Sequence, residues 1–163
     1  LSREARLLEE AGVFLIQVDE PILSTGATDL ATATEALRLV TGNISVPVCL
    51  HVCGTLSGVI DDLLAMPIDI LDGEFAKSPE NLALFRDRDT GTKMVGFGCI
   101  DSSRPEVEEV SAIRARIEEA LTVFAPDQLL IDPDCGLRML PRPSAFSKLS
   151  RMVEAVRQVR QAL

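Results

Sequence analysis

The sequence lacks any apolar run of the ~18–20 residues that a membrane-spanning helix needs. We expect no secretory leader, because the first residues, Leu1 to Arg6, are charged and amphipathic. It also lacks an excess of basic residues. Its net charge is −9, so we expect neither nucleic acid nor a membrane as a partner. The first residue is not methionine, and we therefore expect the chain to be a fragment.

Histidine is almost absent, since His51 is the only one among 163 residues. The four cysteines occur without a secretory leader, which indicates a reducing compartment, and we expect a cytoplasmic protein. In that setting thiols serve as metal ligands or core residues rather than as disulfides. The length suits one domain, and no linker, repeat or low-complexity tract divides it.

Apolar runs typical of strands covered on both faces alternate with helical patterns along the whole chain. Strict alternation predicts a parallel β/α architecture. Five such units fit either a doubly wound sheet or part of a (β/α)8 barrel, and a complete barrel would need about 250 residues. The expected strands are 13–18, 46–52, 68–71, 93–100 and 128–131, and the expected helices are 2–11, 28–40, 56–65, 78–87, 105–124 and 143–162.

Polar side chains follow each expected strand at the point where it ends. In parallel β/α folds this edge of the sheet carries the site, because the loops of successive strands converge there. We therefore expect these side chains to lie at one rim of the fold. They are Asp19, Glu20, His51, Cys53, Asp72, Glu74, Asp101, Asp132, Asp134 and Cys135.

His51 and Cys53 are two residues apart at the end of a strand, so their side chains share one face. Zinc takes thiolate, imidazole and carboxylate ligands, usually four. Cys135 offers a second thiolate from another strand end, and Glu74 offers a carboxylate. A carboxylate after a strand can also be a helix cap or a solvated turn, and Asp72 competes with Glu74 for this role.

The other singled-out residues have ordinary interpretations. Cys49 shares the face of His51 but sits a pleat deeper, and Cys99 lies in an apolar strand, so we expect both in the core. Asp101 can orient a ligand or bind substrate, and it can equally cap the following helix. The Gly96–Gly98 segment is no phosphate loop, because it lies inside a strand and lacks the required lysine and hydroxyl.

Five segments together resemble the C-terminal catalytic barrel of cobalamin-independent methionine synthase. The resemblance extends over essentially the whole chain, with the segments in the order and spacing of that family. It is closest to the short, single-barrel archaeal-type enzymes. The segments are Ile16 to Pro21, His51 to Cys53, Glu74 with Lys77 and Ser78, Val95 to Gly98, and Asp132 to Leu137.

This resemblance implies a zinc ion held by His51, Cys53, Glu74 and Cys135. It implies a (β/α)8 barrel of the class shared with uroporphyrinogen decarboxylase, in which residues 1–163 supply roughly the last five β/α units. It also implies transfer of a methyl group to the thiol of homocysteine, yielding methionine. We assign Asp19, which would bind the substrate ammonium, to substrate binding together with Glu20, and Asp19 and Asp101 to catalysis.

One position departs from the folate-dependent members of the family. Those enzymes have a histidine two residues after the aspartate that matches Asp101, and this chain has Ser103 there. The expected methyl donor is therefore a methyl-corrinoid, as in the archaeal-type enzymes, rather than methyltetrahydrofolate. A methylcobamide:coenzyme M methyltransferase and a non-catalytic zinc-binding barrel fragment are the alternatives.

Five β/α units leave two open sheet edges, which tend to associate unless they are covered. We therefore expect either a second chain or copy of the protein that completes the barrel, or a longer protein of which this chain is a piece.

Overall fold

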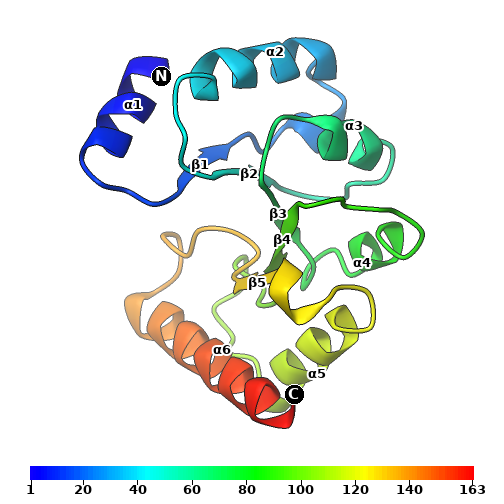
Figure 1. Cartoon of the computed structure of the whole chain (residues 1–163). Helices are drawn as coiled ribbons and strands as arrows, with labels where there is room; N and C mark the ends of the chain where they lie inside the picture. Colours follow the sequence, from blue (N-terminus) through cyan, green and yellow to red (C-terminus); the bar gives the residue numbers. More distant parts are fainter.

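The computed structural model describes all 163 residues, and its centre is one parallel sheet of five strands in the order β1-β2-β3-β4-β5. Each strand is followed by a helical segment, and the helices form an arc around the outside of the sheet (Figure 1). The strands are β1 (Ile16–Asp19), β2 (Val48–Val52), β3 (Ile70–Glu74), β4 (Met94–Gly98) and β5 (Leu129–Asp132). The helices are α1 (Ser2–Glu10), α2 (Leu30–Thr41), α3 (Ile60–Ala65), α4 (Glu80–Leu84), α5 (Val110–Ala120) and α6 (Arg142–Ala162), with short 3-10 helices η1 (Leu23–Thr25) and η2 (Pro126–Gln128).

The two faces of the sheet carry different side chains, as the alternation of strand residues requires. Val48, Leu50 and Val52 of β2 belong to the hydrophobic core that the helices cover. Phe97 of β4 is in the same core and stacks on Phe75 with 4.5 Å between ring centroids. The alternate positions lie outside this core and include Cys49, His51, Asp72, Glu74, Gly96 and Gly98. The polar side chains thus share the face that the helices leave uncovered.

The element boundaries differ from the predicted ones by up to five residues, and α3 and α4 are shorter than the expected helices 56–65 and 78–87. β1 begins at Ile16 rather than at residue 13, and Phe14 is 86% exposed. β3 extends to Glu74, because Gly73 and Glu74 pair with Phe97 and Gly98 of the neighbouring strand. The expected helix 105–124 was too long, since α5 spans only Val110–Ala120.

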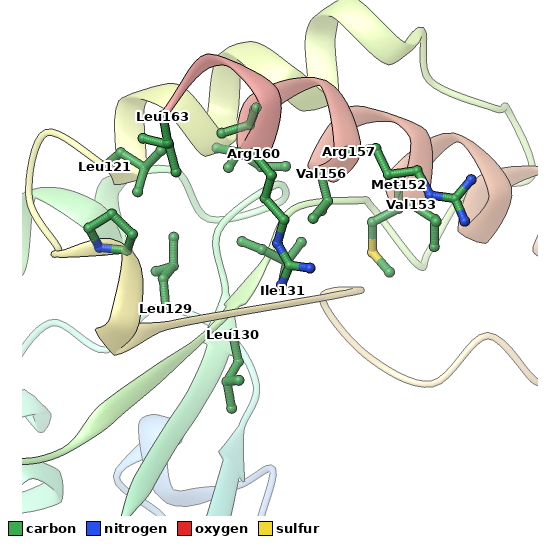
Figure 2. A pocket seen from close by; sticks show the side chains of 13 residues that line it. Leu121, Leu129, Leu130, Ile131, Met152, Val153, Val156, Arg157, Arg160 and Leu163 are labelled. Atoms are coloured by element: carbon green, nitrogen blue, oxygen red, sulfur yellow. The ribbon is translucent and has the colours of Figure 1, made fainter.

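The outer strands β1 and β5 each have one unpaired edge. Beside β5 lies an apolar groove of about 550 Å³ between that strand and α6. Figure 2 shows Ile131 of β5 and Val156 of α6 among its lining residues, and its only charged residues are Arg157 and Arg160. No helix in the structure combines the length and apolar character that crossing a bilayer requires.

Candidate metal centre

Three side chains from two strand ends converge on one point of the sheet. Ligand atoms of His51, Cys53 and Cys135 all lie within 4.8 Å of one another. Cys53 Sγ is 3.3 Å from His51 Nε2 and 3.9 Å from Cys135 Sγ. One nitrogen and two sulfurs at this spacing are a ligand set that suits zinc.

The imidazole of His51 is held from behind by a carboxylate on the neighbouring strand. His51 pairs with Asp72 in the β2–β3 register, and Nδ1 lies 2.6 Å from Asp72 Oδ2. Asp72 fits there because the adjacent position on β4 is Gly96, where a Cβ atom would lie 2.7 Å from Asp72 Cβ. An Nδ1–H donated to the carboxylate leaves Nε2 as the atom that faces the two cysteines.

The protonation of the cluster follows from these contacts. The hydrogen bond to Asp72 raises the pKa of His51 to about 9, against the opposing effect of burial. Burial, followed by the neighbouring Cys135 thiol and the Glu74 carboxylate, raises the pKa of Cys53 to about 12. Without a cation the thiol of Cys53 is therefore neutral at pH 7, and a bound metal would have to displace protons from this site.

Glu74 lies near the three converging residues but outside their 4.8 Å group. It ends β3 and is only 3% exposed. Its Oε2 atom is buried and has no hydrogen-bond donor, and the nearest cation is Lys77, whose Nζ is 3.6 Å away. A buried carboxylate oxygen without a donor is costly, and a metal ion is one group that would satisfy it.

The predicted substrate residues occupy the same rim. Asp19 ends β1 and pairs with His51 in the sheet register, and its exposed carboxylate accepts a hydrogen bond of 2.8 Å from Gln17. Glu20 follows it and is half-buried, and its N–H donates to the carbonyl of His51. The structure therefore places Asp19 beside His51 with a carboxylate open to solvent.

Asp101 lies in the loop after β4. Its carboxylate accepts hydrogen bonds from the backbone N–H and the hydroxyl of Ser103, at 2.8 and 2.6 Å. It does not cap the following helix, because α5 begins only at Val110. The alternative role of Asp101 as a helix cap is therefore wrong.

Asp132 forms a second buried carboxyl group behind the cluster. Burial, followed by the neighbouring Asp72 carboxylate, raises the pKa of Asp132 to about 9. The Oδ1 atoms of both residues are buried without a donor. A proton held on Asp132 would satisfy both oxygens.

Cys99 lies in the hydrophobic core, as predicted, and Cys49 is buried as well, although on the face of His51 rather than in that core. The role of Asp72 as a partner of His51 was missed. No local pattern pointed to it, because the expected strand ended at residue 71 and the observed β3 carries Asp72 only by continuing to Glu74.

Comparison with known proteins matches residues 1–158 to the family model described as "Cobalamin-independent synthase, Catalytic domain". A methionine synthase of Methanothermobacter marburgensis is 49% identical over 152 residues, which are 93% of this chain and 49% of that protein. A methionine synthase of Methanocaldococcus jannaschii is 38% identical over 169 residues, covering 98% of this chain and 54% of that protein.

Among solved structures, a B12-independent methionine synthase from Shewanella sp. W3-18-1, in complex with selenomethionine, superimposes with a TM-score of 0.82 at 26% identity. The match covers 99% of this chain and 54% of that one. The chain thus spans about half the length of the relatives that it matches.

Proposed function

The chain belongs to the cobalamin-independent methionine synthase family, and from this we propose that it carries the zinc-binding part of an enzyme that methylates the thiol of homocysteine. The fold prediction is confirmed, since the five β/α units are part of a (β/α)8 barrel. The observation that carries the proposal is the convergence of His51, Cys53 and Cys135 within 4.8 Å at the rim of the sheet.

We assign His51, Cys53, Glu74 and Cys135 as the zinc ligands. Three of these residues already form a compact donor set, and the unpartnered Oε2 of Glu74 supports its role as the fourth. When bound, zinc would lower the pKa of a coordinated thiol and so make its sulfur a nucleophile at neutral pH.

The residues of this chain would bind and orient the substrate. Asp19 would pair with the ammonium group of homocysteine, and its position beside His51 would direct the substrate thiol toward the two cysteines. Glu20 would support binding from the same loop. Asp101, held by Ser103, would contribute from the loop after β4. These roles amount to positioning, which removes part of the entropic barrier of the transfer.

We further propose a methyl-corrinoid as the methyl donor, acting as a second substrate rather than as a resident cofactor. This rests on Ser103, which stands where the folate-dependent enzymes have a histidine. The chain offers no replacement, because His51 is its only histidine and lies beside the two thiols.

A coenzyme M methyltransferase is the competing enzyme, and Asp19 argues against it. Coenzyme M has no ammonium group, so an exposed carboxylate beside the metal ligands would have nothing to bind. A non-catalytic zinc-binding fragment is the other alternative. It would hold zinc in a closed shell that no thiol substrate can enter.

Residues 1–163 would form the C-terminal part of one zinc-binding barrel domain. The unpaired edges of β1 and β5 and the apolar groove beside α6 are the surfaces that the rest of the barrel would cover. This half of the barrel would supply the zinc ligands and the Asp19 carboxylate, and the substrate pocket would need the other half.

The test is metal analysis followed by addition of thiols. The chain should bind one zinc ion when it is assembled with the rest of its barrel, and X-ray absorption should report nitrogen, sulfur and oxygen ligands. L-homocysteine should exchange one oxygen ligand for sulfur, and coenzyme M should not. Zinc that stays unchanged with both thiols would favour the non-catalytic fragment, and a response to coenzyme M alone would favour the competing enzyme.

A further inference from the structure

Two polar side chains with no solvent exposure, Asn81 and Asp134, lie behind the candidate metal centre. Asn81 is on α4 and reaches two separate loops. Its Oδ1 accepts the N–H of Leu56 at 2.8 Å, and its Nδ2 donates to the carbonyls of Gly54 at 2.9 Å and Glu74 at 2.8 Å. Asn81 therefore connects the loop that follows Cys53 with the end of β3.

Asp134 makes a second connection of the same kind. Its Oδ1 accepts the N–H groups of Phe75 and Ala76 at 3.0 and 2.9 Å, and its Oδ2 accepts that of Lys77 at 2.8 Å. Three successive N–H groups around one carboxylate form an anion-binding nest. The N–H of Asp134 donates to the carbonyl of Ile100. Asp134 thus fixes the loop after β3 to the loop after β5.

A glycine makes this second connection possible. β4 lies between β3 and β5, and its last residue, Gly98, is the point that Asp134 crosses. A Cβ atom at Gly98 would lie 2.6 Å from Asp134 Oδ1 and 2.7 Å from the carbonyl oxygen of Gly73. Any side chain at residue 98 would therefore push Asp134 away from the nest.

We propose that Asn81 and Asp134 are positioning residues that hold Cys53, Glu74 and Cys135 in the geometry of one metal shell. Gly54 follows Cys53, Asp134 precedes Cys135, and both connections meet at the backbone around Glu74. The inference rests on the proposed function, because it requires these three residues to be zinc ligands.

The connection addresses a specific problem of this site. Its proposed ligands come from the ends of β2 and β3 and from the loops after β2 and β5, and Glu74 is not yet in the same 4.8 Å group as the other three residues. If these segments were flexible, forming the metal coordination shell would cost conformational entropy. Residues that orient metal ligands typically contribute 10–100-fold to metal affinity.

The experiment compares Asn81→Asp and Asp134→Asn with the wild-type chain. Both variants keep the shape of the side chain. Asn81→Asp replaces the NH2 donor by an acceptor oxygen, and Asp134→Asn replaces one acceptor oxygen by an NH2 donor. Zinc affinity is measured by chelator competition, and the Co2+ form is examined by visible absorption, which reports the geometry of the shell. Hydrogen exchange of residues 74–77 is measured without metal. We expect a 10–100-fold loss of zinc affinity in each variant, an altered Co2+ spectrum, and faster exchange in Asp134→Asn.

Asp69→Asn is the matched control. Asp69 also accepts a backbone N–H from the neighbouring strand, that of Val48 at 2.8 Å, but at the opposite end of the sheet. The Asp69→Asn variant should leave zinc affinity and the Co2+ spectrum unchanged. If Asp134→Asn does not fold, Asp134→Ala is used in its place, because alanine has no NH2 group that would face the backbone N–H of Lys77.

The outcomes separate the two proposals. Wild-type zinc binding with unchanged affinity in the folded variants would overturn the inference and leave the proposed function standing. Failure of both Asp134 variants to fold would also overturn it, because the residue would then serve stability rather than ligand placement. A wild-type chain that binds no zinc would overturn the proposed function, and the inference with it.

Discussion

The imidazole of His51 lies against the carboxylate of Asp72 with 2.6 Å between Nδ1 and Oδ2, on adjacent strands in register. This contact fixes the orientation of the ring and directs Nε2 toward Cys53 and Cys135. It also explains Gly96, since a side chain there would occupy the space of Asp72. The relationship links a strand glycine, a buried carboxylate and the imidazole nitrogen that we propose as a zinc ligand in one row of the sheet.

Replacement of Asp72 by alanine should weaken zinc binding by about 10–100-fold, as for other carboxylates that orient a histidine ligand. The pKa of His51 should fall from about 9, because the hydrogen bond to Asp72 is the main cause of its elevation. Both effects can be measured, by chelator competition and by NMR titration of the only histidine. An unchanged His51 pKa in the variant would contradict the contact.

Zinc binding should depend on Cys53 and Cys135 but not on Cys99. Cys53→Ser and Cys135→Ser should each lose most of the bound zinc, because serine at neutral pH does not supply an anionic ligand. Cys99→Ser should retain it, since Cys99 is buried away from the 4.8 Å group. The zinc content of each variant, measured after gel filtration, tests this expectation. Equal loss in all three variants would count against the ligand assignment.

Much of the arrangement could be predicted from alternation alone. The five strands, their parallel order and the gathering of His51, Cys53 and Cys135 at one edge follow from the pattern of apolar runs and from where they end. The boundary at Glu74 could not be predicted, because Asp72 and Gly73 are weak strand formers whose pairing is set by β4. The partners of Asn81 and Asp134 are backbone groups distant in sequence, which leave no local pattern.

The early start expected for α5 failed for a related reason. Three glutamates at 106, 108 and 109 are typical of a first helical turn. In the structure they precede the helix, and Glu108 instead accepts hydrogen bonds from Lys148 and from the backbone of Asp101. A tertiary ion pair thus took the place of a favourable interaction with the helix terminus.

Substitution of Gly96 by alanine should damage both stability and the metal site. The new Cβ would lie 2.7 Å from Asp72 Cβ and Oδ1, so the backbone or the carboxylate must move. Overpacking of this kind costs about 1–3 kcal/mol, and displaced Asp72 would no longer orient His51. Urea unfolding and zinc affinity should therefore change together.

Gly136→Ala is the control for that substitution. Gly136 lies next to Cys135, yet apart from residues 135 to 137 themselves no atom lies within 4 Å of the position that its Cβ would take. Its free energy of unfolding should stay close to that of the wild type. Equal destabilisation by both alanines would show that the space required by Asp72 is not what selects glycine at residue 96.

The ion pair of Glu108 and Lys148 should make stability depend on acid pH. Lys148 is 1% exposed, and its Nζ donates to Glu108 Oε2 at 2.6 Å and to the carbonyl of Asp101 at 2.9 Å. Burial opposes ionisation of Glu108, but hydrogen bonds from Lys148 and the Asp101 N–H prevail and lower its pKa. The folded chain therefore binds fewer protons at this group than the unfolded chain, in which the pKa is about 4.3.

Stability gained from Glu108 should then be fully present above pH ~5 and be lost as the pH falls through the lowered pKa. Glu108→Gln should destabilise the chain at pH 7 by about 1–3 kcal/mol, because it leaves the Lys148 ammonium without its counter-charge. The difference from the wild type in urea unfolding should shrink toward pH 3. Lys148→Met in the Glu108→Gln background should recover part of the loss at pH 7. A difference that stays constant from pH 7 to pH 3 would mean that the charge of Glu108 does not stabilise this loop.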